Sequence, residues 1–91
     1  MFNKLKQLKD LRSTAKTMQD ALSTERVEES RGGVKIIMNG NMEVLSVVLD
    51  NGLSKEAAEN GVKNCINETI KKAQRLMAKK MQDMGGFPGL N

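Results

Sequence analysis

Residues 54–84 carry apolar side chains at intervals of three or four, with one interval of seven, which is typical of an amphipathic helix. The stripe consists of Ala58, Val62, Ile66, Ile70, Ala73, Met77 and Met84, and it is widened by Cys65, Leu76 and Met81. At about 1.5 Å per residue, this helix is roughly 46 Å long. A compact domain of this length has a radius of gyration of only about 12 to 13 Å. We therefore expect the helix to extend beyond the core of its own chain.

The opposite side of this predicted helix is cationic. At about 100° per residue, four basic side chains fall within one sector of the helix surface. They are Lys71, Lys72, Arg75 and Lys79. An apolar face that extends beyond its core is unfavourable in water, so we expect a second chain to cover it. The cationic face then remains free to bind a polyanion.

A second amphipathic helix is predicted over residues 2–24. Its apolar positions follow a spacing of three and four, as in a heptad repeat. They are Leu8, Leu11, Ala15, Met18 and Leu22. On the far side of this helix lie Lys9, Arg12 and Lys16. Both predicted helices are therefore basic on their outer faces.

Between the helices the pattern changes to that of three strands, at residues 26–30, 34–39 and 42–49. Arg31-Gly32-Gly33 has turn composition, and Asn39-Gly40 predicts a hairpin. The third strand is apolar on both faces, so we expect both of them to be covered. Ser54 is the predicted N-cap of the long helix, and residues 85–91 form a predicted flexible tail. The result is an α+β fold, an N-terminal helix, a three-stranded antiparallel meander and a long C-terminal helix, in one domain spanning residues 1–91.

Small size and an exposed sheet together predict self-association. A chain of 91 residues buries barely enough surface to be stable alone. A three-stranded meander also leaves one face and both edges open, and pairing two sheets, edge to edge or face to face, would bury them. We predict a two-fold homodimer.

The formal net charge is +4, but the charge is unevenly distributed along the chain. Residues 1–22 hold five basic and two acidic side chains, and residues 61–84 hold six basic and two acidic ones. Residues 32–60, in the central part of the chain, hold two basic and four acidic side chains. The helices therefore carry a stronger positive field than the net charge indicates.

The composition argues against several other functions. The chain has no histidine and one cysteine, Cys65, so we predict no metal site, no cofactor, no small-molecule substrate and no enzymatic activity. An unpaired cysteine on an apolar helix face fits a reducing, cytoplasmic setting. No run of 18 apolar residues predicts a membrane span. Phe2 and Phe87 are the only aromatic residues, which favours duplex over single-stranded nucleic acid, because single strands are usually bound by aromatic stacking.

The order of these motifs resembles the YbaB/EbfC family of bacterial nucleoid-associated proteins. The resemblance rests on Gly33-Val34-Lys35-Ile36-Ile37-Met38-Asn39-Gly40, Val47-Val48-Leu49-Asp50, Ile66-Asn67-Glu68-Thr69 and the terminal GGFPGL. It covers nearly the whole chain. It implies a tweezer-like homodimer in the nucleoid, with helical arms that bind duplex DNA with little or modest sequence preference. The sequence differs from the family pattern at Thr69, where a small alanine is usual.

The resemblance gives no single residue that contacts DNA, so the candidate site is predicted from charge. It comprises Lys9, Arg12, Lys16, Lys71, Lys72, Arg75 and Lys79. These side chains would neutralise phosphates and release counterions, which gives affinity without sequence readout. Surface amides on the long helix could also reach base edges. They are Asn64, Asn67, Gln74 and Gln82.

Two other interpretations remain open at this stage. Lysines on the outside of amphipathic helices often serve only solubility, and Glu68 could neutralise Lys71 and Lys72 within the helix. The alternative function is a dimeric helical adaptor that grips a protein partner through Met77, Met81 and Met84, since methionine surfaces adapt readily to partners.

Overall fold

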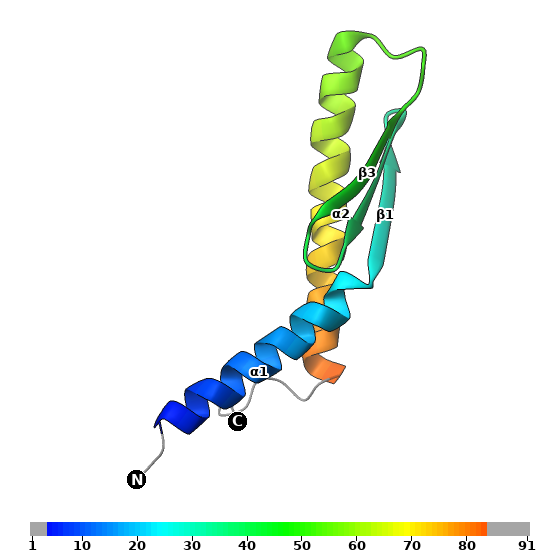
Figure 1. Ribbon diagram of the computed structural model, residues 1–91. Helices are drawn as coiled ribbons and strands as arrows, with labels where there is room; N and C mark the ends of the chain where they lie inside the picture. The colour runs from blue at the N-terminus through cyan, green and yellow to red at the C-terminus, as the bar shows by residue number, and fades with distance from the viewer. Residues whose placement is uncertain (1–3, 84–91) are drawn as a thin grey trace.

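The computed structural model describes residues 4–83, and these form two helices and one antiparallel sheet (Figure 1). The elements in chain order are α1 (Lys4–Ser23), β1 (Arg26–Arg31), β2 (Val34–Asn39), β3 (Val44–Leu49) and α2 (Lys55–Asp83). The sheet has the strand order β1-β2-β3. This confirms the predicted α+β fold of a helix, a three-stranded meander and a long helix. The predicted tail, residues 85–91, lies outside the described residues.

Helix α2 packs against β1 and β2 through a stripe of small residues. The buried positions of α2 recur every four residues, and they are Gly61, Cys65, Thr69 and Ala73. A Cβ atom at Gly61 would lie only 2.7 Å from Cγ2 of Val34, so glycine permits the close approach of helix and sheet. Val34, Ile36 and Cys65 form the centre of this core.

This packing corrects the apolar stripe predicted for the long helix. Thr69, a polar residue, is fully buried, and its hydroxyl donates to the carbonyl of Cys65 at 2.7 Å. Ile66 and Ile70, predicted at the centre of the stripe, are only partly buried. The sheet lies so close to the helix that small side chains occupy the centre and larger ones lie on the flank. Met84, the last predicted member, is outside the described residues.

The two hairpins differ in how they turn. Gly32 and Gly33 have φ angles of 57° and 80°, as expected for a two-residue turn. In the second hairpin the positive φ, 64°, falls on Met42, while the side-chain oxygen of Asn39 accepts from the N–H groups of Asn41 and Glu43 at 3.0 Å each. Because this side chain closes the turn, β3 begins two residues later than predicted, at Val44.

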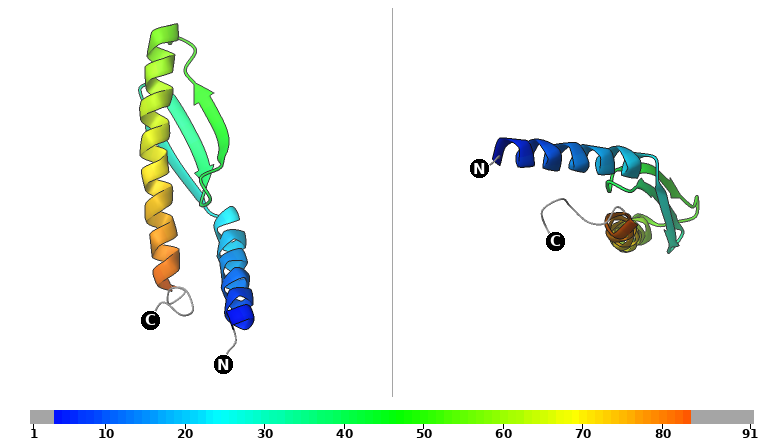
Figure 2. Two further views of the ribbon diagram at one scale, coloured as in Figure 1. Left: turned by 90° about the vertical axis from the view of Figure 1, so that its left-hand side faces the viewer. Right: turned by 90° about the horizontal axis from the view of Figure 1, so that it is seen from below.

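The β2–β3 turn anchors the C-terminal end of α1. The Gly40 N–H donates to the Leu22 carbonyl at 2.9 Å, and the Asn41 side chain donates to the Gln19 carbonyl at 2.9 Å. Of the apolar positions predicted on this helix, only Met18 and Leu22 are buried. The rest of α1 extends away from the sheet as an arm (Figures 1 and 2).

The described structure is elongated. Its principal extents are 64 × 19 × 18 Å and its radius of gyration is 17.7 Å, against about 12 Å for a compact chain of this length. The C-terminal part of α2 continues past the end of the sheet, towards the same end of the molecule as α1 (Figure 2). The predicted extension of the long helix beyond its core is therefore observed.

Candidate functional site

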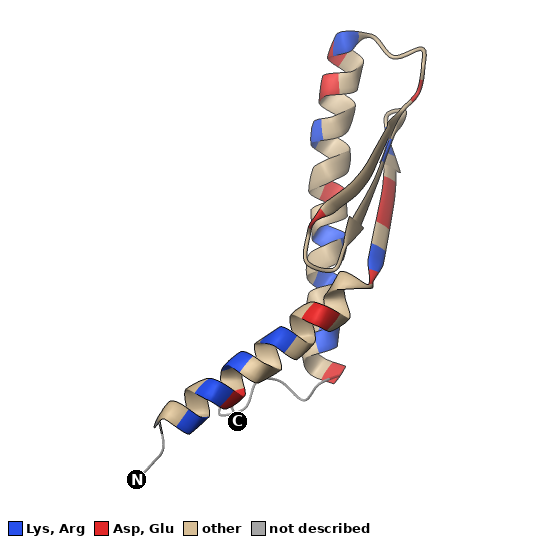
Figure 3. Cartoon of the chain, in the orientation of Figure 1, with Lys and Arg blue, Asp and Glu red and all other residues tan. Residues whose placement is uncertain are grey.

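The basic residues of α1 lie on the surface of the arm. Lys9, Arg12 and Lys16 are exposed, and none of them forms an ion pair with another residue in the range 4–83. Together they place three uncompensated charges on a helix that has few contacts with the rest of the chain. Figure 3 shows that the blue positions of α1 and those of the C-terminal part of α2 lie towards the same end of the molecule.

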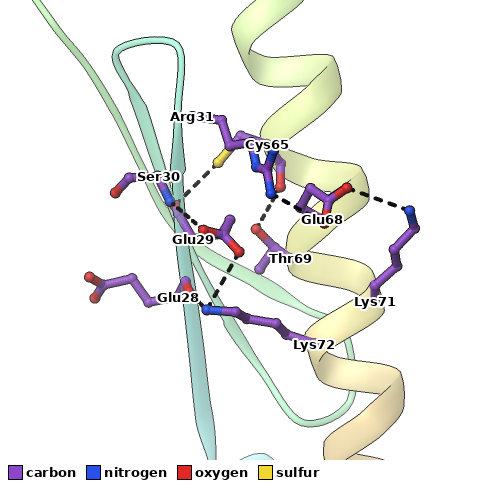
Figure 4. A network of polar contacts seen from close by, with 9 residues as sticks. All are labelled: Glu28, Glu29, Ser30, Arg31, Cys65, Glu68, Thr69, Lys71 and Lys72. Atoms are coloured by element: carbon purple, nitrogen blue, oxygen red, sulfur yellow. Dashed lines mark hydrogen bonds and ion pairs between the residues drawn. The ribbon is translucent and has the colours of Figure 1, made fainter.

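The four basic residues predicted on α2 fall into two groups. Arg75 and Lys79 are exposed and have no carboxylate partner among the described residues. Lys71 and Lys72 are paired (Figure 4). Lys71 lies 3.5 Å from Glu68 on the same helix.

Lys72 is directed towards the sheet. Its ammonium group lies 3.5 Å from the Glu29 carboxylate and donates to the Glu28 carbonyl at 2.9 Å. It therefore contributes less to the outer charge of α2 than its position on a helical wheel indicates. The structure does not place Lys72 with Arg75 and Lys79 on a common free surface.

Lys72 belongs to a series of three ion pairs that join β1 and its preceding residue to α2. Lys80 pairs with Glu25 at 2.9 Å, Lys72 with Glu29 at 3.5 Å, and Arg31 with Glu68 at 3.6 Å. As the residue number rises from 25 to 31 on the strand side, the number of the partner on α2 falls from 80 to 68. We call these three pairs the β1/α2 ion-pair ladder. Each pair is solvent-accessible and worth little alone. Their common effect is to fix the long helix along the edge strand.

Two members of this ladder have shifted pKa values. Burial of the Glu29 carboxyl works to raise its pKa, but the Ser30 N–H and the Lys72 ammonium outweigh burial and hold the pKa below its ordinary value of 4.5. The hydrogen bond and charge of Glu25 raise the pKa of Lys80 above 10.5. Both shifts favour the ionised pair in the folded state.

The lowered pKa of Glu29 predicts acid sensitivity. Its ionised form stabilises the fold at pH values above 4.5, and this contribution is lost as the pH falls through the lower folded-state pKa. We expect Glu29→Gln to lower the melting temperature at pH 7 and to have progressively less effect as the pH falls below 4.5. Thermal unfolding of the parent, Glu29→Gln, Lys72→Gln and the double variant measures the coupling of the pair at each pH. A coupling that persists unchanged at pH 3 would contradict this role.

A second surface of the chain is apolar rather than basic. Strand β3 has no charged residue and is an edge strand, and most of its side chains are about half exposed on both faces. These are Val44 (44%), Leu45 (46%), Val47 (48%), Val48 (52%) and Leu49 (46%). The expectation that both faces of this strand are covered is wrong within one chain, because α2 packs on β1 and β2. Leu5, Leu8 and Leu11 of α1 are also exposed.

Neither helix within residues 4–83 is long and apolar enough to cross a membrane.

Comparison with known proteins identifies the family. A model of the YbaB/EbfC DNA-binding family matches residues 1–87. This chain belongs to the YbaB/EbfC DNA-binding family. The family resemblance inferred from the sequence is thereby confirmed.

Individual relatives of this YbaB/EbfC family member come from several bacteria. A nucleoid-associated protein of Syntrophobacter fumaroxidans is 33% identical, with 98% of this chain and 89% of the relative covered. A nucleoid-associated protein of Nitrobacter hamburgensis is 36% identical, with 94% of this chain and 87% of the relative covered. One from Methylococcus capsulatus is 35% identical, with 82% and 74% covered.

In this YbaB/EbfC family member, five of the seven predicted residues share the same environment. These exposed cations without a carboxylate partner in the described range are Lys9, Arg12, Lys16, Arg75 and Lys79, and we call them the arm cations. Lys6 and Lys63 have the same environment but are absent from the predicted site. Neither residue lies in the helical sectors that define the two predicted basic faces. The sequence would indicate them only if every lysine and arginine on the two helices were included in the predicted site.

Proposed function

We propose that this protein is a nucleoid-associated protein that binds duplex DNA as a homodimer through its basic helical arms. Binding rests largely on phosphate contacts, has little sequence specificity and affects nucleoid organisation or gene expression. The family is described as DNA-binding, and the cited relatives are named nucleoid-associated proteins. We infer a location in the nucleoid and a role without catalysis.

The observation that carries this proposal is the distribution of paired and unpaired charge. Arg31, Lys72 and Lys80 lie next to carboxylates in the β1/α2 ion-pair ladder, so their charge is largely balanced. The arm cations have no such partner among residues 4–83, and they lie on the two helices that extend past the sheet. Cations without a carboxylate partner, on helices that extend past the sheet, are able to contact a long polyanion at several points, because phosphates recur along the whole length of a DNA duplex.

The homodimer is supported by β3. Its outer edge has no strand partner within the described chain, and its apolar side chains are half exposed on both faces. An uncharged strand can pair with a second copy of itself about a two-fold axis without bringing like charges together. We propose that two β3 strands meet in this way, which places two sets of arms on one assembly and doubles the cationic surface.

Salt dependence provides the first test. If the dimer neutralises four to six phosphates, the affinity for a random-sequence duplex should fall with a slope of about −4 to −5 in log–log form. Between 50 and 200 mM salt this corresponds to a loss of at least about 250-fold. Fluorescence anisotropy of a labelled duplex, titrated at several salt concentrations, measures the slope.

Two outcomes would contradict the proposal. Affinity that is insensitive to salt would exclude phosphate neutralisation as the source of binding. No binding even at 50 mM salt would reject duplex DNA as the partner, and would favour the alternative of a protein partner held at Met77 and Met81, which are half-buried on α2.

A further inference from the structure

The outward side of α2 carries a line of amide side chains. Positions spaced by three and four lie on one side of a helix, and those at 60, 64, 67, 71, 74, 78 and 82 all face away from the buried stripe. Each of these residues is exposed. Five of the seven are amides, which we call the amide ridge, namely Asn60, Asn64, Asn67, Gln74 and Gln82. The other two are Lys71 and Ala78, so the line contains no carboxylate.

The amide ridge has no evident structural role. Within residues 4–83, none of its five side chains hydrogen-bonds to another residue, and the one contact on this side is that of Lys71 with Glu68. Asparagine is a poor helix former, because its side chain competes with the helix backbone for hydrogen bonds. Three asparagines on the exposed side of this helix therefore reduce its stability without a compensating contact, and lysine or glutamate would serve solubility better. The fold therefore does not explain their presence.

The surroundings of the ridge suit a DNA groove. Lys63 and Arg75 are exposed on either side of its centre, where they could contact the two phosphate backbones. Asn64 and Asn67 also border an open polar hollow of about 480 Å³, which Glu68 and Lys71 line as well, and whose opposite wall includes Arg31 at the end of β1 and Gly32. A helix about 10 to 12 Å across fits a major groove about 12 Å wide.

We propose that the amide ridge reads adenine edges in the major groove. Asn64, Asn67 and Gln74 are central, and the residues from 64 to 74 span about 15 Å of helix. A side-chain amide can donate to adenine N7 and accept from the adenine N6 amino group at the same time. This inference rests on the proposed function. Phosphate contacts supply most of the affinity, and the ridge adds a smaller preference for accessible adenines.

The test compares three duplexes of equal length at one salt concentration. The first is rich in A·T pairs, the second is the same duplex with 7-deazaadenine in place of adenine, and the third is rich in G·C pairs. The 7-deaza substitution removes the N7 acceptor while base pairing and the minor groove are retained. We expect the parent protein to bind the first duplex at least about fivefold more tightly than the other two.

The triple variant Asn64→Ala/Asn67→Ala/Gln74→Ala should bind all three duplexes equally, with the affinity that the parent shows for the 7-deaza duplex. Alanine is the better helix former, so this variant is expected to fold at least as well as the parent. Asn51→Ala, which removes an exposed amide from the loop before α2, is the matched control and should keep the parent's preference.

Each remaining outcome separates this inference from the proposed function. Equal binding of all duplexes by the parent would overturn base reading and leave duplex binding intact. A preference that survives in the triple variant would place the readout elsewhere. No binding to any duplex at 50 mM salt would reject the proposed function together with the inference.

Discussion

Reversing the charge of Arg75 and Lys79 is expected to abolish duplex binding while the fold persists. Both side chains are exposed and lack a carboxylate partner in the described chain, so Arg75→Glu/Lys79→Glu breaks no ion pair there. In a dimer the change removes four cations and adds four anions near the phosphates. At 50 mM salt each lost phosphate contact costs roughly tenfold in affinity, so the total loss should be at least about 1,000-fold. Fluorescence anisotropy with a random-sequence duplex measures it.

The control must change the net charge by the same amount at another place. Lys35→Glu/Lys55→Glu does so on β2 and at the first turn of α2, away from the arm cations. It breaks the Lys35–Glu28 pair, but that pair is half-exposed and is expected to contribute little. If both double variants lose affinity equally, binding follows net charge and the assignment to the arms is wrong. Circular dichroism and light scattering should show both variants folded and in the parent's oligomeric state.

The order of the elements is predictable from the sequence because it depends on local patterns. The long helix begins after Ser54, whose hydroxyl accepts from the Ala57 N–H at 3.1 Å, as an N-cap residue should. Gly32 and Gly33 take the positive φ angles that glycine tolerates best. Each of these features involves residues at most four positions apart, so no knowledge of the tertiary structure is needed.

The packing of α2 is less predictable, because it depends on the distance to the sheet. Hydrophobicity alone places Ile66 and Ile70 at the centre of the buried stripe. The structure has Gly61 and Thr69 there instead, since only small side chains fit where the helix lies closest to β2. The sequence signal for this packing is the spacing of small residues, which recur every four positions from 61 to 73.

The candidate site is predictable in part, and the difference lies in contacts that are distant in sequence. A helical wheel places Lys72 beside Arg75, but Glu29 and the Glu28 carbonyl, both more than 40 residues away, bind its ammonium group. Such pairing depends on how β1 lies along α2, which periodicity does not specify. Lys71 shows the opposite case, because its partner Glu68 is three residues away on the same helix, and this spacing predicts the pair from the sequence alone.

An acidic residue on β3 is expected to dissociate the homodimer and, with it, most of the DNA affinity. Val47 lies in the middle of β3 and is 48% exposed in the single chain. In the proposed assembly Val47→Asp would bring two carboxylates into an apolar contact, where neither has a partner. Size-exclusion chromatography with light scattering should then show a monomer of 10.0 kDa. A monomer presents half of the phosphate contacts, so the affinity at 50 mM salt should fall by roughly 1,000-fold and the salt slope should halve.

The matched control for this experiment is Leu5→Asp on α1. Leu5 is 83% exposed, so the substitution also adds a carboxylate to an exposed apolar position, but on the arm. If β3 forms the interface, Leu5→Asp remains dimeric. The reverse result, a dimeric Val47→Asp and a monomeric Leu5→Asp, would place the contact between copies on the leucines of α1. A parent protein that is monomeric at micromolar concentration would reject the homodimer, and a single chain would then have to supply all the phosphate contacts.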